Sequence, residues 1–134
     1  MGDVQLTDGA KHTILVIDDE KVQRDLCVQA LVAAGFSVVT AEDGERGLAQ
    51  AIESTPDLIL LDNRMPKMSG YEMLKRLRSK NSWGAQVPVI FLTNIPQESD
   101  AESADVEGTE PAHYLMKSDI TLADVVTKIK EVLT

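Results

Sequence analysis

The sequence has little cysteine, no long apolar run and few basic residues. Its single cysteine, Cys27, cannot form an internal disulfide and lies within a helical pattern, so we expect a small buried apolar side chain there. No apolar run approaches the roughly 18 residues that would span a bilayer, which argues against a membrane protein. Residues 1–11 lack the features of a secretory signal, so we expect a flexible N-terminal tail and a cytoplasmic location.

The shortage of basic residues gives the chain a formal net charge of −9, from 13 Lys and Arg against 22 Asp and Glu. This charge repels phosphate backbones, and no basic cluster interrupts it, so nucleic-acid binding is not expected. A length of 134 residues suits one domain, which we place at residues 12–134.

Strand and helix patterns alternate along the chain. Apolar runs predict strands at residues 13–17, 37–40, 57–61, 87–92 and 113–116. Helical spacing of apolar residues predicts helices near 22–30, 48–52, 74–77 and 122–133, with a short helix around 98–106 in an acidic segment. The alternation predicts an α/β fold, a flavodoxin-like doubly wound five-stranded parallel sheet of order 2-1-3-4-5 with five helices.

Three positions mark the ends of the expected helices. Gly35 should end the first helix. Ser69 with Glu72 has the spacing of a capping box and should start the third helix. Thr121 with Asp124 is a weaker version of the same pattern for the last helix.

Three aspartates follow two of the expected strands. Asp18 and Asp19 come directly after residues 13–17, and Asp62 closes the run 57–61. In the expected order these strands are neighbours, so the carboxylates would meet at the C-terminal edge of the sheet. Two carboxylates about 5 Å apart repel by about 3 kcal/mol at an effective dielectric near 20. A hard divalent cation would relieve this repulsion, which favours a Mg²⁺ site, with Mn²⁺ as an alternative, over three merely solvated loop acids.

Two more strand ends carry complementary groups. The fourth strand ends at Thr93, a hydroxyl, and the fifth is followed by Lys117, an ammonium. Either residue alone is ordinary, because a terminal Thr is usually a cap and such a Lys is usually solvated. With the acids they suit phosphoryl transfer, in which an aspartate attacks, Mg²⁺ and Lys117 neutralise charge, and Thr93 donates a hydrogen bond.

With these residues, the sequence resembles the receiver domains of two-component response regulators over about residues 12–133. The segment Asp62-Asn63-Arg64-Met65-Pro66-Lys67-Met68-Ser69-Gly70 carries much of the resemblance. It implies that Asp62 accepts a phosphoryl group from a phosphohistidine donor, such as a histidine kinase or a phosphotransfer protein. It also implies that Asp19 binds Mg²⁺ directly and Asp18 through water.

The same resemblance assigns roles to four further residues. The backbone carbonyl of Arg64 would complete the metal ligands, and Lys117 would contact the phosphoryl group. Thr93 would sense that group, and Tyr114 matches the family's switch aromatic, which turns inward as Thr93 moves. The alternative for Tyr114 is a simple strand-edge aromatic.

Some positions depart from the family pattern. Ser118 stands where proline usually follows the lysine, and a cis peptide without proline costs about 2.5–4 kcal/mol, which bears on how Lys117 approaches the site. Asn94 replaces a small residue, and Ile95 occupies a position where polar residues often handle attacking water. We expect Asn94, Ile95 and Arg64 to lengthen the lifetime of the phosphorylated state.

The sequence therefore predicts a phosphorylation-activated signalling receiver that is not an enzyme in the usual sense, although it should catalyse its own Mg²⁺-dependent phosphorylation and slow dephosphorylation. We expect it to signal through protein contacts on the face made by its fourth helix, fifth strand and fifth helix. Its oligomeric state stays open. One alternative is a receiver cut from a multidomain regulator or hybrid kinase. Another is a phosphatase of the haloacid-dehalogenase type, disfavoured because Arg64 stands where that family needs an acid.

Overall fold

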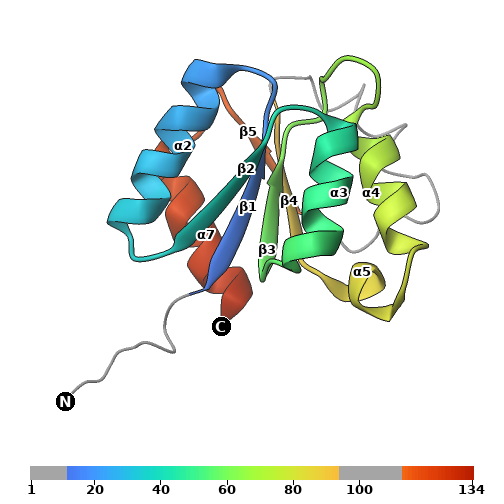
Figure 1. Ribbon diagram of the computed structural model, residues 1–134. Coiled ribbons are helices and arrows are strands. Elements are labelled where there is room, and N and C mark those ends of the chain that lie inside the picture. Colours follow the sequence, from blue (N-terminus) through green and yellow to red (C-terminus); the bar gives the residue numbers. More distant parts are fainter. Residues whose placement is uncertain (1–11, 94–112) are drawn as a thin grey trace.

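The computed structural model describes residues 12–93 and 113–134 of the chain. The expected N-terminal tail at residues 1–11 and the expected helix at 98–106 lie outside these ranges. The described residues form a five-stranded parallel sheet of order β2-β1-β3-β4-β5, flanked by helices on both faces (Figure 1). The predicted fold class and strand order are confirmed.

The strands follow the apolar runs closely. They are β1 (Thr13–Ile17), β2 (Ser37–Ala41), β3 (Leu58–Leu61), β4 (Val89–Thr93) and β5 (His113–Met116). In register, Ile17 of β1 lies beside Ala41 of β2 and Leu61 of β3. The ends of these three strands are therefore level, and the residues that follow β1 and β3 leave the sheet at the same edge.

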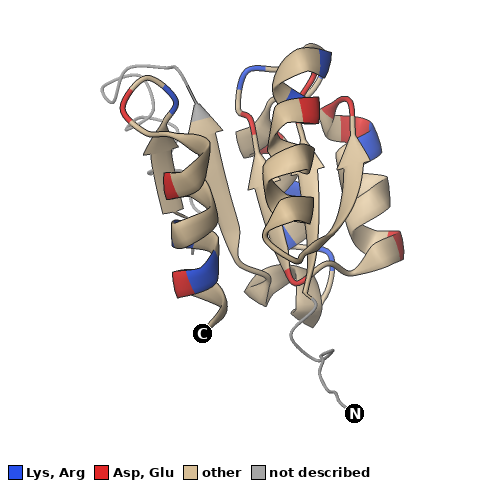
Figure 2. Ribbon diagram, turned by 90° about the vertical axis from the view of Figure 1, so that its left-hand side faces the viewer, with Lys and Arg blue, Asp and Glu red and all other residues tan. Residues whose placement is uncertain are grey.

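Alternate strand residues face two separate cores. On one face, residues such as Ile17, Leu61 and Phe91 form a buried cluster with α3 (Gly44–Ser54) and α4 (Gly70–Arg78). On the other face, residues such as Val16 and Leu60 cluster with α2 (Lys21–Ala33) and α7 (Leu122–Leu133). Cys27 belongs to this second cluster and is 2% exposed, as expected for a core residue. In the described part of the chain, Lys, Arg, Asp and Glu lie on helices and loops, and the five strands carry none (Figure 2).

The helix ends agree with the sequence signals, except that the two predicted capping boxes differ in strength in the opposite order. Gly35 follows the end of α2 with φ +99°, a left-handed conformation that glycine adopts without a steric penalty. At α7, Thr121 and Asp124 form a complete capping box, in which each side chain accepts from the other's main-chain N–H. At α4, Ser69 accepts from the N–H of Glu72, while the Glu72 carboxylate pairs with Arg76. The predicted weaker signal thus gives the fuller motif.

A short helix, α5 (Ser82–Gln86), was not anticipated. Its N-terminus is capped by the Asn81 side chain, which accepts from the N–H of Gly84 over 2.7 Å. The buried guanidinium of Arg78 donates to the carbonyls of Gly84 and Val87 at 2.9 and 2.6 Å. Burial lowers the pKa of Arg78. These contacts attach α5 to the end of α4.

None of the helices in the described part of the chain is both long and apolar enough to cross a membrane.

Candidate functional site

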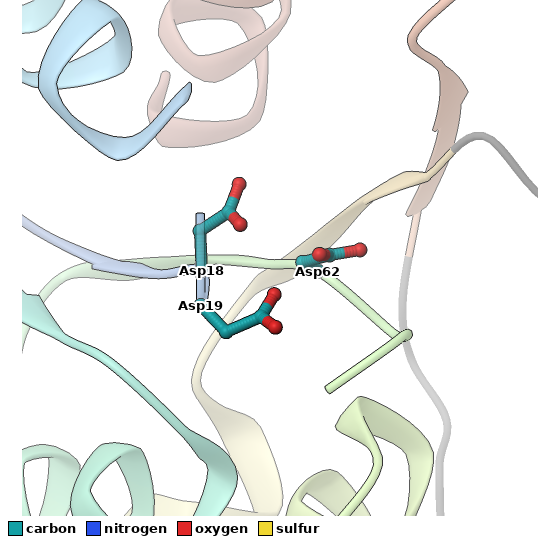
Figure 3. Close-up of side chains that lie close together, drawn as sticks. All are labelled: Asp18, Asp19 and Asp62. Carbon is teal, nitrogen blue, oxygen red and sulfur yellow. The ribbon is translucent and has the colours of Figure 1, made fainter. Parts of the chain in front are cut away.

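Three aspartates meet at the C-terminal edge of the sheet. Asp18 and Asp19 follow β1, and Asp62 follows the neighbouring strand β3 (Figure 3). One carboxylate oxygen from each lies within 4.8 Å of the others. Asp18 and Asp62 are buried, with 3% and 8% of their surface exposed, while Asp19 is exposed. The convergence expected from the strand order is present.

The turn from β1 into α2 is short and held by several hydrogen bonds. The N–H of Asp18 donates to the carbonyl of Ala41 on β2 over 3.2 Å. The Asp18 Oδ1 accepts from the N–H of Glu20 over 2.9 Å, and its carbonyl accepts from Nη1 of Arg24 over 2.7 Å. The first two carboxylates are thus carried on a turn fixed to both the sheet and α2.

The loop from β3 into α4 is longer and closed at its base by Asn63. The carbonyl of Asn63 accepts from the N–H of Gly70 over 2.9 Å, and its side-chain Oδ1 accepts from the N–H of Tyr71 over 3.0 Å. A Cβ added at Gly70 would lie 2.6 Å from the carbonyl oxygen of Asp62, so any other residue would require the loop or α4 to shift. The start of α4 is thereby fixed against the aspartate.

Arg64 lies in this loop with an exposed side chain. Its main-chain N–H donates to Oδ1 of Asp62 over 3.3 Å. The peptide group between Asn63 and Arg64 therefore lies next to the Asp62 carboxylate. The metal-binding role expected of the Arg64 carbonyl, which belongs to the following peptide group, stays a prediction.

Lys117 reaches the aspartates from the end of β5. Its Nζ lies 3.6 Å from Oδ2 of Asp18 and 3.9 Å from Oδ2 of Asp62, and 12% of its side chain is exposed. The serine at position 118 does not keep the ammonium from the site. One cation thus faces two buried carboxylates, and their charges are only partly balanced.

The Asp62 carboxyl has a strongly raised pKa, which means that its ionised form is disfavoured at this site. Burial raises its pKa from an ordinary value of 3.8 to about 7. The positive charge of Lys117 lowers this pKa and the negative charge of Asp18 raises it. The hydrogen bond from the N–H of Arg64 lowers it, and the charge of Asp19 raises it. An aspartate that resists ionisation between two other acids is stabilised by a bound cation, because the cation favours its charged form.

The donor set fits magnesium. The site offers three carboxylates, and hard oxygen ligands of this kind are those that Mg²⁺ binds, usually through one or two carboxylates with retained waters. The exposure of Asp19 leaves one side of the cluster open to solvent and to a phosphate group.

The remaining predicted residues are placed in part. Thr93 ends β4 beside Met116 of β5, but its side chain, together with Asn94 and Ile95, lies outside what the structure describes. Tyr114 is half-buried on β5, and its ring stacks on Phe91 with centroids 5.3 Å apart and planes 8° apart.

The Tyr114 ring also contacts Tyr71 of α4, with centroids 6.4 Å apart. Tyr114, on the edge strand β5, is thus partly buried and packs against the core cluster that includes Phe91 and Tyr71.

Two residues that support the site were not anticipated from the sequence. Arg24 holds the Asp18 carbonyl, and Asn63 closes the loop after Asp62. The available signals were a basic residue five positions after Asp19 and an amide directly after Asp62, and neither is specific by itself.

Comparisons with known proteins agree with the resemblance. Residues 14–130 match the family described as the response regulator receiver domain. The chain is 33% identical over 126 residues to the probable transcriptional regulatory protein TcrX of Mycobacterium tuberculosis, covering 94% of this chain and 51% of that protein. It is 40% identical over 87 residues to PhoP of Bacillus subtilis, a transcriptional regulatory protein of alkaline phosphatase synthesis, covering 65% of this chain and 35% of PhoP. The chain therefore spans about half or less of these curated relatives.

Solved structures show the same fold over nearly the whole chain. The chemotaxis protein CheY4 of Vibrio cholerae superposes with a TM-score of 0.82 at 27% identity, covering 92% of this chain and 100% of that one. A CheY-like receiver domain protein from Methanospirillum hungatei gives a TM-score of 0.80 at 27% identity, covering 92% and 94% of the two chains.

Proposed function

Because this chain belongs to the response regulator receiver domain family of two-component signalling, we propose that Asp62 is its phosphoacceptor. The observation that carries the proposal is the meeting of Asp18, Asp19, Asp62 and Lys117 at one strand edge. Receiver domains are signalling modules rather than enzymes in the usual sense. The chemistry proposed here is a single transfer onto the protein itself.

In the proposed step, a carboxylate oxygen of Asp62 attacks the phosphorus of a phosphohistidine and forms an acyl phosphate. The bond between phosphorus and the imidazole nitrogen breaks, and its electron pair stays on the imidazole. Lys117 faces Asp62 with its ammonium, so it lies where it can neutralise oxygens of the transferred group. Thr93, at the adjacent strand end, would donate a hydrogen bond to one of those oxygens.

Asp19, Asp62 and the carbonyl of Arg64 would hold Mg²⁺ directly, and Asp18 would act through water. When bound, the ion supplies positive charge that favours the ionised form of Asp62 and offsets charge on the phosphoryl oxygens. The Asp62 carboxyl has a raised pKa without metal, yet a nucleophilic carboxylate must be deprotonated. A bound cation that lowers this pKa would keep Asp62 ionised, which supports the assignment of a metal ion here.

The phosphoryl donor would be a histidine kinase or a phosphotransfer protein. Thr93 would draw toward the acyl phosphate and let Tyr114 turn further inward, changing the surface over β5, α7 and the segment between β4 and β5. The stacking of Tyr114 on Phe91 supports this role, because Phe91 lies on β4, the strand that ends at Thr93. A movement at the end of β4 could therefore be passed to the Tyr114 ring through this contact. We propose that this surface contacts a downstream protein, and a receiver that forms part of a longer regulator would use it in the same way.

Ile95, Asn94 and Arg64 would slow the loss of the phosphoryl group. Hydrolysis needs a water held in line with the bond to phosphorus, and Ile95 has no group that could hold it. Positioning a reacting water is worth about 10- to 100-fold, so Ile95→Gln should speed dephosphorylation measurably. The decay of radiolabelled phosphoprotein at fixed Mg²⁺ tests this. A rate unchanged by the substitution would contradict the role of Ile95.

The phosphoacceptor assignment is tested by mass spectrometry after treatment with acetyl phosphate and Mg²⁺. Wild type should gain one phosphoryl group, and Asp62→Asn should gain none. The matched control is Asp57→Asn, which changes an acid at the opposite end of β3 that accepts from the N–H of Thr13. An equal mass gain in wild type and Asp62→Asn would refute the assignment.

A further inference from the structure

Arg24 links the first helix to the acidic turn. It lies on α2, half-buried, and its main-chain N–H donates to the carbonyl of Glu20 over 2.9 Å in the helix. Its side chain runs back toward the sheet, where Nη1 donates to the carbonyl of Asp18 over 2.7 Å. The guanidinium therefore joins the helix to the end of β1.

The peptide group that Arg24 holds is the one between Asp18 and Asp19. The orientation of this peptide sets the direction in which the Asp19 side chain leaves the backbone. The Asp18 side chain is fixed from the other side, because its Oδ1 accepts from the N–H of Glu20. Asp19 itself is exposed, so the turn, rather than packing around the side chain, determines where its carboxylate lies.

The carboxylates also repel one another, and that repulsion acts to open the turn. Their oxygens lie within 4.8 Å, and the Lys117 ammonium faces Asp18 and Asp62. A hydrogen bond from a charged donor to the Asp18 carbonyl resists this opening, since such bonds are shorter and stronger than neutral ones.

We propose that Arg24 is a positioning residue for the metal-binding carboxylates, acting through the peptide group between Asp18 and Asp19. The inference rests on the proposed Mg²⁺ site. It goes beyond that site in assigning part of the metal affinity to a cation on α2 that does not touch the ion.

The positive charge of Arg24 allows its positioning role to be told apart from its charge by the direction in which Mg²⁺ affinity changes. A cation near a metal site repels the metal, so losing only the charge should tighten Mg²⁺ binding. Losing the positioning contact should weaken it instead, because groups that orient metal ligands are commonly worth about 10- to 100-fold in affinity. The two effects are opposed, and a single measured direction separates them.

The experiment is calorimetric titration of Mg²⁺ into the metal-free chain. Arg24→Met removes the donor and the charge but keeps the apolar stem, and it should weaken binding about 10-fold. Arg24→Lys keeps the charge and a donor, and it should stay within about 3-fold of wild type because a single contact does not need the planar fork of arginine. Lys21→Met is the matched control, because Lys21 is a highly exposed cation on the same helix that pairs with Asp25. It should bind Mg²⁺ as tightly as wild type or more tightly.

The outcomes separate the inference from the proposed function. Binding by Arg24→Met that is unchanged or tighter overturns the positioning role, whereas failure of wild type to bind Mg²⁺ overturns the metal site itself. Urea unfolding of each variant without metal shows whether it folds. If Arg24→Met does not fold, Arg24→Gln decides instead, because its shorter side chain cannot reach the Asp18 carbonyl from the same position and should also weaken binding about 10-fold.

Discussion

The two connections that supply the acidic residues are built differently. The turn between β1 and α2 covers only residues 18–20, and its hydrogen bonds run to β2 and to α2 itself. The loop between β3 and α4 covers residues 62–69 and is tied mainly at its base, through Asn63. It contains an exposed Arg64 and a left-handed Lys67 with φ 72°.

This difference matches two different tasks. The first turn presents carboxylates in a fixed position, which suits binding an ion. The second loop carries the carboxyl that resists ionisation, and in the proposed reaction it must accept a new group. The free-energy cost of an unfavourably ionised carboxylate therefore lies in the longer loop, at Asp62. Each of the following changes tests this division of roles between the turn and the loop.

The largest effect should come from removing the Asp62 charge. Its pKa in the folded protein is about 7, above the ordinary value of 3.8, so the folded state binds this proton more tightly than the unfolded chain. Stability without metal should therefore fall as the pH rises from about 4 to 7. A difference of about 3 between the two pKa values sets a ceiling near 4 kcal/mol, so Asp62→Asn should gain about 3 kcal/mol at pH 8.

Urea unfolding of wild type and Asp62→Asn at a series of pH values measures this gain. It should shrink as the pH falls toward 4 and should also shrink in saturating Mg²⁺, which stabilises wild type alone. A variant that is less stable than wild type at pH 8 without metal would show that Asp62 is not strained.

The next effect should distinguish the two aspartates of the first turn. Asp19→Ala should weaken Mg²⁺ binding about 10- to 100-fold, because a direct ligand is lost. Asp18→Ala should cost less, since Asp18 is expected to act through water and already faces Lys117. Calorimetry of both variants decides the ranking, and equal affinities for wild type and Asp19→Ala would exclude Asp19 as a ligand.

A smaller effect should follow from closing the space at Gly70. In Gly70→Ala the new methyl would lie 2.6 Å from the carbonyl of Asp62, and the loop or α4 must shift. Such overpacking costs about 1–3 kcal/mol, partly offset by the better helix propensity of alanine, so a net loss of about 1–2 kcal/mol is expected. Thermal unfolding measures it. The matched variant Gly35→Asn keeps a residue that tolerates the left-handed conformation and has open space around it, so it should cost less.

The smallest effect should come from Lys67. A residue other than glycine in the left-handed region destabilises the folded state by about 1 kcal/mol, and glycine would remove this penalty. Part of the gain is offset because glycine loses more backbone entropy on folding. Lys67→Gly should therefore stabilise the protein by about 0.5 kcal/mol in urea unfolding. A loss of stability would show that the Lys67 side chain contributes to the loop.

The sequence was most informative where local patterns and burial agree. The three central strands, β1, β3 and β4, are buried and appear as apolar runs, and all five strands were predicted to within a few residues. The acidic edge followed from strand order alone. The short helix α5 was missed because five residues carry no helical period, and its position depends on the Asn81 cap and on Arg78.

The supporting contacts of the site could not be predicted for a related reason. Arg24 and Asn63 act on main-chain groups, and any residue type offers the same carbonyl or N–H to them. The approach of Lys117 likewise depends on the backbone after β5 rather than on residue type, so Ser118 was a poor guide to it. The predictions for Asn94 and Ile95 stay predictions.

The buried guanidinium of Arg78 has a consequence for local unfolding. A helix of five residues is not stable by itself, so α5 stays folded through tertiary contacts, which include Arg78, the Asn81 cap and the packing of Trp83 against the core. Its residues should open as one unit whenever the end of α4 frays. Amide protons of α5 would then exchange with solvent long before those of β1 and β3, at a rate set by α4 rather than by global unfolding.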